Sequence, residues 1–322
     1  MVTEELKQEI LKTAVEVAGR APSLHNSQPW RFTCASDRVE LYADYSRWLP
    51  STDADGRDVL VSCGAALHHL RLALADAGMH ATVHRLPSVV DPHHLATVEV
   101  RAGGPHLDSV TQLLAAVDSR RTDRRPFRDW PIPETFVQQL IERAAEQGTV
   151  LRVIGDAGTT SVLLAAVAAA GVTQANVPSY EAELSSWTGR TGDDGIPLSN
   201  LPDRTGTRVV AERRFTEGLI KPLGMAAPDA ATFLVLGTAS DDRLSQLRAG
   251  EALSAVLLQA TELGLATCPL SQPLEVAATR DVLRDDVLDG TLSPQIVLRL
   301  GWAPTDPPLP PTPRRTLHDL LR

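Results

Sequence analysis

The chain has 322 residues, a formal net charge of −9, 43% hydrophobic residues and 22% charged residues. That length exceeds what one ordinary core needs, so we expect two domains or one large two-part fold. The composition excludes a disordered chain or a fibre, and the negative charge opposes broad non-specific binding to nucleic acid or anionic lipid.

The first part of the chain predicts one mixed unit of helices and strands. Thr3 can cap a helix whose apolar residues fall at helical spacing and which ends at Gly19. A long, mostly apolar helix over 57–77 is expected to be buried, and a further helix runs from 107 to about 119. Strands are predicted at 30–34, 39–43, 79–86 and 95–101.

An internal repeat indicates two similar halves. The segment from Gly64 to Gly78 aligns without a gap on the segment from Gly250 to Gly264, at an offset of 186 residues. Residues 8–16 pair with 138–146 at an offset of 130, so the order of a helix, a buried helix and a strand recurs. We therefore predict an α+β chain of two tandem halves, 1–117 and 118–322.

The two offsets differ by 56 residues, which predicts an insertion in the second half. It must lie within 155–229, where an apolar helix is followed by a stretch rich in glycine and proline. Long irregular insertions in compact folds are often lids or binding loops, although a tolerated surface excursion fits the same pattern.

Two motifs carry the most chemical information. The loop 21–29 packs hydroxyl and amide side chains between prolines directly before a strand, which suits hydrogen bonding to a planar heterocycle. Taken alone, the segment also fits a helix-terminating turn followed by a buried tryptophan. The run 119–128 holds five cationic side chains, a pattern that a solvated face or a domain linker also fits, and the pair Arg314 and Arg315 follows a proline-rich stretch near the C-terminus. Guanidinium groups bind phosphate through two hydrogen bonds, so two separated arginine pairs could converge on one phosphate monoester.

These motifs resemble those of the FMN-dependent nitroreductase family over essentially the whole chain. Pro-Ser-x-x-Asn-x-Gln-Pro-Trp-Arg-Phe looks like that family's flavin-contacting loop, and Arg-Arg-Thr-x-Arg-Arg-x-Phe looks like its phosphate-gripping segment. Each half keeps one motif, which is similar to the fused, Acg-like members. The resemblance implies a nitroreductase-like fold, in which the two halves form a pseudo-dimer with one complete FMN site in a functional monomer.

The resemblance also assigns the residues of that site. The Pro-rich loop after Cys268 would lie over the flavin ring, and the C-terminal arginines would complete the phosphate grip. Thr122 and Asp123 depart from the usual pattern of the phosphate segment. The expected FMN-binding residues are Pro22, Ser23, Asn26, Gln28, Pro29, Trp30, Arg31, Arg120, Arg121, Thr122, Pro269, Ser271, Arg314 and Arg315.

Other cofactor classes find little support in the sequence. There is no GxGxxG, P-loop or GxSxG motif, and the histidines lack metal-ligand spacing. Three cysteines without CxxC spacing indicate reduced thiols. The longest apolar stretch, 162–172, is shorter than a spanning helix, and residues 1–10 carry acids where a secretory signal carries a positive head. We therefore expect a cytoplasmic protein without a metal, nucleic-acid or membrane partner.

Two functions follow from the resemblance. The first is an NAD(P)H-dependent oxidoreductase that reduces nitroaromatic or quinone-like acceptors through FMN, with no side chain needed as nucleophile or base. The second is an FMN storage or sequestering protein, in which the stretch 180–208, with Trp187, Arg190 and several glycines, folds over the ring as a lid.

Overall fold

The computed structural model describes residues 3–105, 107–203, 213, 215, 218–220, 229–304 and 308–322. Its first half is one antiparallel sheet with the strand order β1-β2-β4-β3. The strands are β1 (Trp30–Cys34), β2 (Arg38–Ala43), β3 (Met79–Arg85) and β4 (His94–Ala102). All four agree with the strands predicted from the sequence within one or two residues.

Two helices pack on this sheet and on each other. In α1 (Glu4–Ala18) the hydroxyl of Thr3 accepts the backbone N–H of Leu6 at 3.3 Å, so the predicted N-cap is confirmed. The helix α2 (Arg57–Asp76) is buried along almost its whole length, as its apolar sequence predicts. It ends before Gly78, whose φ of +69° is a conformation that glycine adopts without strain.

The second half repeats this arrangement. Its antiparallel sheet has the order β5-β6-β8-β7, which matches the first sheet strand for strand. The helix α4 (Glu134–Glu146) packs on α7 (Arg243–Glu262) as α1 packs on α2. The strands are β5 (Val150–Ile154), β6 (Thr232–Thr238), β7 (Ala266–Leu270) and β8 (Ser293–Gly301). The predicted tandem α+β fold is therefore confirmed.

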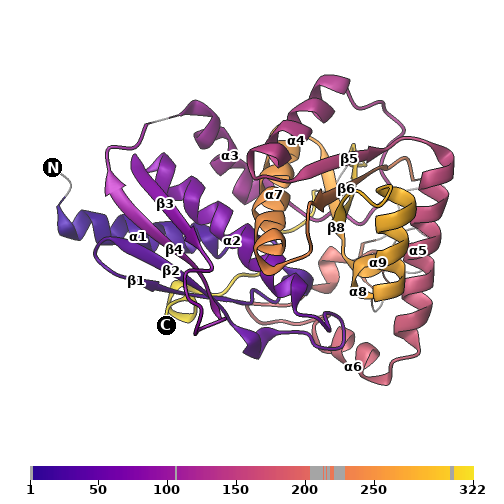
Figure 1. Ribbon diagram of the computed structural model, residues 1–322, viewed down its shortest axis with the longest axis horizontal. Helices are drawn as coiled ribbons and strands as arrows, with labels where there is room; N and C mark the ends of the chain where they lie inside the picture. The colour runs from indigo at the N-terminus through magenta and orange to yellow at the C-terminus, as the bar shows by residue number, and fades with distance from the viewer. Residues whose placement is uncertain are drawn as a thin grey trace.

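The two halves meet where α2 crosses α7, at the centre of the molecule (Figure 1). A Cβ atom on Gly64 would lie 2.0 Å from the carbonyl oxygen of Leu247, and one on Gly250 would lie 1.9 Å from that of Val61. Both pairs of equivalent residues are 186 positions apart in the sequence. The two contacts are therefore related by an approximate two-fold rotation, like the two equivalent contacts across the interface of a symmetric dimer.

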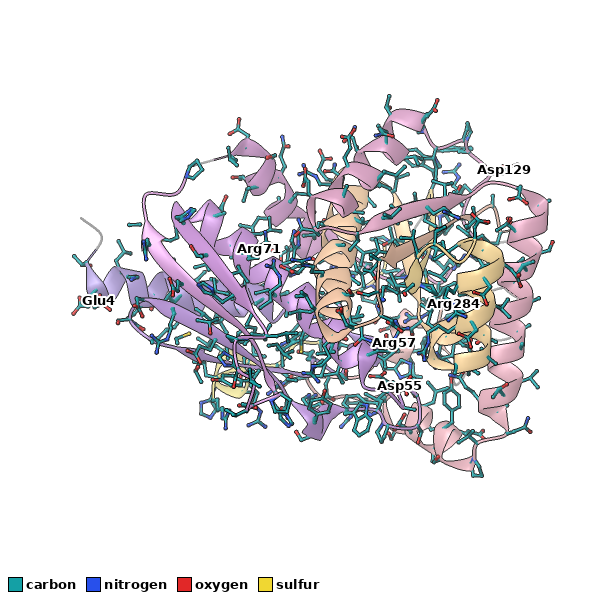
Figure 2. All side chains as sticks on the ribbon, viewed as in Figure 1. Glu4, Asp55, Arg57, Arg71, Asp129 and Arg284 are labelled. Carbon is teal, nitrogen blue, oxygen red and sulfur yellow. The ribbon has the colours of Figure 1, made fainter. Side chains whose placement is uncertain are left out.

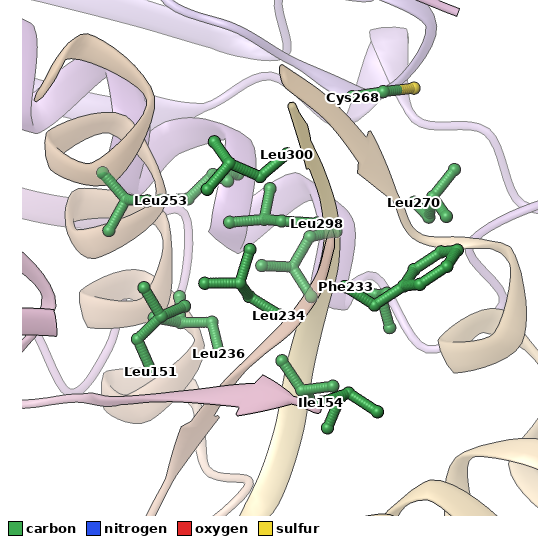
Figure 3. Close-up of a cluster of buried hydrophobic side chains, with 14 of the residues drawn as sticks. Leu151, Ile154, Phe233, Leu234, Leu236, Leu253, Cys268, Leu270, Leu298 and Leu300 are labelled. Atoms are coloured by element: carbon green, nitrogen blue, oxygen red, sulfur yellow. The ribbon is translucent and has the colours of Figure 1, made fainter. Parts of the chain in front are cut away.

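Each half has its own hydrophobic core, shared at the crossing helices. In the second core, Leu234, Leu236 and Leu298 point to the α7 side of the sheet, whereas Phe233 and Leu270 point to the opposite side (Figure 3). A buried leucine or phenylalanine contributes roughly 1.5–3 kcal/mol, so these cores supply most of the stability of the fold.

The predicted insertion lies between β5 and β6. Its described part contains α5 (Ala157–Ala175), α6 (Pro178–Ser186) and the short 3-10 helix η3 (Leu198–Asn200). By length and composition α5 is the one helix among the described residues that could cross a membrane. Its side chains Leu163 and Val167 pack instead into the second core, together with the short helices that follow β7.

The remaining elements connect the halves. The helix α3 (Asp108–Ser119) packs on both α2 and α7. The C-terminal segment returns from the second half to the first, where α10 (Leu317–Leu320) packs on α1 and β1 (Figure 1). The short elements are η1 (Leu24–Asn26), η2 (Tyr45–Arg47), α8 (Gln272–Glu275), α9 (Ala277–Val282) and the π-helix η4 (Leu283–Val287).

Candidate functional site

The loop that the sequence singles out has an unusual backbone. His25, Asn26 and Gln28 have φ values of 47°, 57° and 51°, a left-handed conformation that non-glycine residues rarely adopt. The hydroxyl of Ser23 accepts the backbone N–H of Gln28 at 2.9 Å and closes the loop on itself. Such strain persists only where surrounding contacts fix it, and it is concentrated at functional sites.

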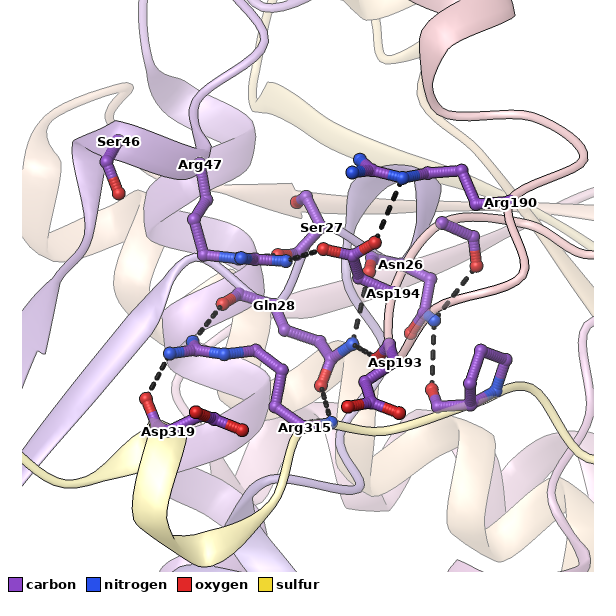
Figure 4. Close-up of polar contacts among 12 residues, drawn as sticks. Asn26, Ser27, Gln28, Ser46, Arg47, Arg190, Asp193, Asp194, Arg315 and Asp319 are labelled. Carbon is purple, nitrogen blue, oxygen red and sulfur yellow. Dashed lines mark hydrogen bonds and ion pairs between the residues drawn. The ribbon is translucent and has the colours of Figure 1, made fainter.

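The amide side chains of the loop bind other segments of the chain (Figure 4). Asn26 Nδ2 donates to the Gly195 carbonyl and to the Pro313 carbonyl, each at 3.0 Å. Gln28 donates to the Asp193 carbonyl at 2.8 Å, and its Oε1 accepts the N–H of Arg315 at 2.9 Å. These two predicted FMN contacts therefore join the loop to the insertion and to the C-terminal segment.

The insertion is held there by an ion pair as well. Asp194 accepts from Arg47, which follows β2, and from Arg190 at 3.1 Å (Figure 4). The Arg190 guanidinium also lies 4.5 Å from the centre of the Trp187 ring. The segment 187–196 thus lies against the loop, although the end of the predicted lid at 208 lies outside the described residues.

Other predicted FMN-binding residues contact the first core or the backbone of the loop. Trp30 is fully buried in the first core, and Arg31 pairs with Asp44 at 2.7 Å. The Arg315 guanidinium donates to the carbonyls of Gln28 at 3.2 Å and of Trp30 at 3.1 Å. It is therefore directed at the loop rather than at the other predicted phosphate ligands.

A pocket lies between the two halves, and we call it the interhalf pocket. Residues from both predicted motifs line it: Pro22 and Ser23 from the first half, and Thr122, Pro269 and Ser271 from the second. The space outside the protein atoms, including the open mouth, is about 850 Å³. Residues of both split motifs thus line one pocket, whereas the other predicted FMN-binding residues are not among those that line it.

The walls of the interhalf pocket include residues that the sequence did not single out. Apolar side chains come from several elements, among them Val61 of α2, Val167 of α5 and Leu253 of α7. Arg213 and Phe215 reach it from the insertion. The buried helices were predicted, but periodicity alone does not tell which buried residue faces a cavity instead of another side chain.

His25 borders the same space. Its ring lies 5.7 Å from that of Phe215, edge to face, and both of its nitrogens are buried without a hydrogen-bond partner among the described residues. Burial, followed by the charges of Arg213 and Arg124, holds the pKa of His25 well below its usual range. The histidine is therefore neutral, and no group of three metal-ligating side chains occurs among the described residues.

A cluster of arginines forms next to the first turn of the loop. Arg120 is 5% exposed, and its Nε and that of Arg314 are buried without a hydrogen-bond partner among the described residues. Burial and the neighbouring Arg121 lower the pKa of Arg120 to about 10. Burial and the charges of Arg120, Arg121 and Arg20 lower the pKa of Arg314 to about 9.

The outer members of this cluster are already occupied. Arg121 donates to the carbonyls of Asp118 at 2.7 Å and Arg120 at 2.9 Å, and Arg20 pairs with the carboxylate of Asp118. Arg314 likewise donates to the carbonyls of Pro313 at 2.9 Å and of Arg20 at 3.2 Å. Within the described part of the chain, neither Arg120 nor Arg314 pairs with a carboxylate. A bound anion would stabilise buried cations that lie this close together.

Known proteins identify the family. The chain is 43% identical over 317 residues to the protein named "Putative NAD(P)H nitroreductase Rv3131" of Mycobacterium tuberculosis, covering 97% of this chain and 91% of that protein. The chain belongs to the nitroreductase family. A second relative from the same organism, named "Putative NAD(P)H nitroreductase acg", is 37% identical and covers 97% of this chain and 95% of its own length. The model of the nitroreductase family matches residues 203–302.

The nitroreductases with solved structures are less similar to this chain in sequence than the relatives named above. NfnB from Mycobacterium smegmatis, solved with NADPH, aligns with 67% of this chain and 99% of its own at 15% identity and a TM-score of 0.43. A nitroreductase from Desulfitobacterium hafniense, solved with bound FMN, aligns with 66% of this chain and 97% of its own at 15% identity and a TM-score of 0.41. The assignment to the nitroreductase family therefore rests on the sequence relatives.

Proposed function

We propose that this nitroreductase-family chain binds one FMN in the interhalf pocket and uses NAD(P)H to reduce quinone-like or nitroaromatic acceptors. The observation that carries the proposal is that residues of both half-motifs line this one pocket. Two further motif residues, Arg120 and Arg314, are buried, and their Nε atoms have no hydrogen-bond partner among the described residues. When bound, FMN supplies the centre that accepts and donates hydride.

The residues present fit such a cofactor. Within the described ranges, the Nε atoms of Arg120 and Arg314 lack partners, and a phosphate would supply the missing acceptors and neutralise the mutual repulsion of the two cations. Val61, Leu253 and Val167 provide apolar walls for a planar ring, with the hydroxyls of Ser23 and Ser271 at the edge. Since one chain supplies both halves of the pocket, a monomer would suffice for binding.

The second candidate, sequestration of FMN, is favoured by one specific observation. The segment 193–195 is bonded to the loop residues Asn26 and Gln28, and Arg213 and Phe215 of the same insertion line the pocket. A segment held in this way would restrict access of a nicotinamide ring to the cofactor. The two candidates share the binding site and differ in whether the bound cofactor is turned over.

A spectroscopic titration separates the two candidates. Purified protein is loaded with FMN, its flavin and phosphate are quantified per chain, and its visible spectrum is followed on anaerobic addition of NADPH. We expect one FMN per chain and bleaching of the flavin. Two flavins per chain would contradict the single-site proposal, and a yellow colour that persists would favour sequestration.

Shortening the insertion tests its role as a cover. Replacing 186–204 by a Gly-Ser turn removes the bonds that Asn26 and Gln28 make to the insertion. If the segment covers the cofactor, FMN stays bound but dithionite and NADPH reduce it faster than in the parent protein. Equal reduction rates would remove the main support for sequestration.

A further inference from the structure

An acidic side chain faces the interhalf pocket and forms no ion pair with the residues that the structure describes. Asp58 is the second residue of α2, lines the pocket and is 6% exposed. Its Oδ2 is buried and has no hydrogen-bond partner among the described residues. An ionised carboxylate in such a place would lose its hydration without compensation, whereas the neutral acid loses much less.

Asp58 does not cap the helix α2, although its position in the first turn suggests that it would. An acid in the first turn of a helix commonly accepts a free backbone N–H. In α2 this contact is made by Asp53, whose Oδ2 accepts the N–H of Val59 at 3.1 Å. The carboxyl group of Asp58 is therefore not used to cap α2, and it faces the pocket.

The groups around Asp58 come from the loop before α2, from α8 and from the insertion. Asp53 and Glu275 add negative charge, and Arg57 and Arg213 add positive charge. Burial first, then the two carboxylates, raise the pKa of Asp58 well above its usual range, against the opposing effect of the arginines. Burial also raises the pKa of Asp53, to about 6.

Both arginines have their hydrogen bonds elsewhere. Arg57, which lies between the two halves (Figure 2), donates to Asp241 at 3.0 Å and to Gln295 at 2.8 Å. Arg213 pairs with Glu275, which also accepts from Ser271 at 2.7 Å. Neither guanidinium therefore holds Asp58 in its ionised form by a direct contact.

We propose that Asp58 carries a proton at neutral pH and donates it to the molecule that is reduced in the interhalf pocket. This inference rests on the function proposed above. Reduction of a quinone by NAD(P)H transfers one hydride equivalent, oxidises the nicotinamide and leaves the acceptor one proton short. The O–H bond of Asp58 breaks, an O–H bond forms on the acceptor oxygen, and the carboxylate regains a proton from water at the pocket mouth.

Infrared spectroscopy of the cofactor-free protein tests the protonation state. At pH 7.5 we expect the carbonyl band of a protonated carboxyl group, which disappears as the pH is raised. The band should be lost in Asp58→Asn and kept in Asp55→Asn, the same change at an acid with 62% side-chain exposure on the preceding loop. Asp53→Asn should keep it too. A wild-type spectrum without the band, or an unchanged band in Asp58→Asn, overturns the proposal.

Reoxidation kinetics test the transfer. FMN-loaded protein reduced by NADPH is mixed with benzoquinone, and we expect Asp58→Asn to react at least tenfold more slowly than wild type with unchanged FMN content. The wild-type rate should fall as the pH rises through the infrared transition, whereas the rate of Asp58→Asn should not follow it. Equal rates and pH profiles overturn the transfer step.

Failure of the proposed function would look different. If the protein binds no FMN, or FMN is not reduced by NADPH, the function proposed above is wrong and the transfer step falls with it. The infrared band of the cofactor-free protein still decides whether Asp58 is protonated. If Asp58→Asn does not fold, the pH titration of the infrared band in the wild-type protein still tests the protonation state.

Discussion

The two sheets have the same strand order but different surroundings. In β4 buried valines alternate with Thr97, Glu99 and the exposed Arg101, so one face of the first sheet is open to solvent. In β8 every residue after Ser293 is buried. The second sheet has α7 on one face and, on the other, the insertion and the short helices after β7 (Figure 1).

The difference separates the parts of the molecule that set the architecture from the parts that line the interhalf pocket. The part that is equal in both halves, the sheets and the crossing of α2 and α7, determines the architecture. The part that is unequal lines the interhalf pocket: Val167 and Arg213 come from the insertion, and Gln272 comes from α8. The interhalf pocket is therefore lined by residues that have no counterpart in the first half.

Exchanging residues between the sheets should have the largest effect. Glu99 of β4 and Val297 of β8 lie on matching strands of the two sheets, but Val297 is 0% exposed. Val297→Glu buries an unpaired charge and should lower the free energy of unfolding by roughly 5 kcal/mol or prevent folding. Glu99→Val should change it by less than about 0.5 kcal/mol, because its ion pairs are exposed.

Urea denaturation measures both variants. Where Val297→Glu yields no folded protein, Val297→Ala should still cost about 2 kcal/mol. A Val297→Ala variant as stable as wild type would mean that the second sheet is not covered on its outer face.

The symmetric crossing should respond symmetrically. Gly64→Ala and Gly250→Ala each place a methyl group about 2 Å from a backbone oxygen of the facing helix. Each should lower the free energy of unfolding by roughly 3 kcal/mol, because backbone cannot move aside as a flexible side chain would. Gly171→Ala is the control: its Cβ would meet its nearest neighbour at 3.6 Å, so the better helix former should be neutral or slightly stabilising.

The smallest effect is expected at the arginines and concerns binding. Removing a charge-assisted contact costs roughly 1.5–3 kcal/mol, so Arg120→Ala and Arg314→Ala should each weaken FMN binding at least tenfold. Riboflavin, which lacks the phosphate, should bind as before. Arg315→Ala should weaken both ligands alike, because its guanidinium supports the loop. Fluorescence titration with the two ligands decides, and an equal loss for both ligands in Arg314→Ala would contradict its role.

The sequence predicted most of this architecture because the signals were local. Thr3 indicates the start of a helix, alternation of apolar and polar residues indicates the strands, and the offset of 186 residues makes Gly64 and Gly250 equivalent. It also predicted that both halves would contribute to one site. Periodicity and capping depend on neighbours in the chain, and these rules held.

The hydrogen-bond partners of polar side chains could not be predicted in the same way. The amides of Asn26 and Gln28 can bind a flavin or a backbone carbonyl with the same chemistry, and here they bind carbonyls of the insertion and the C-terminal segment. Arg314 and Arg315 are neighbours in sequence but point to different partners. Asp58 and Asp53 stand five residues apart around Gly56, and only the fold shows which of them caps α2.

The crossing of α2 and α7 also records what covalent fusion permits. His68 and Ser254 are equivalent positions, and His68 Nδ1 lies 2.8 Å from the Ser254 hydroxyl, while burial keeps the histidine neutral. In an assembly of two identical chains, both positions would have to hold the same residue, giving two imidazoles or two hydroxyls. A single chain can encode an unlike, complementary pair there, and so can adjust each side of its own axis independently.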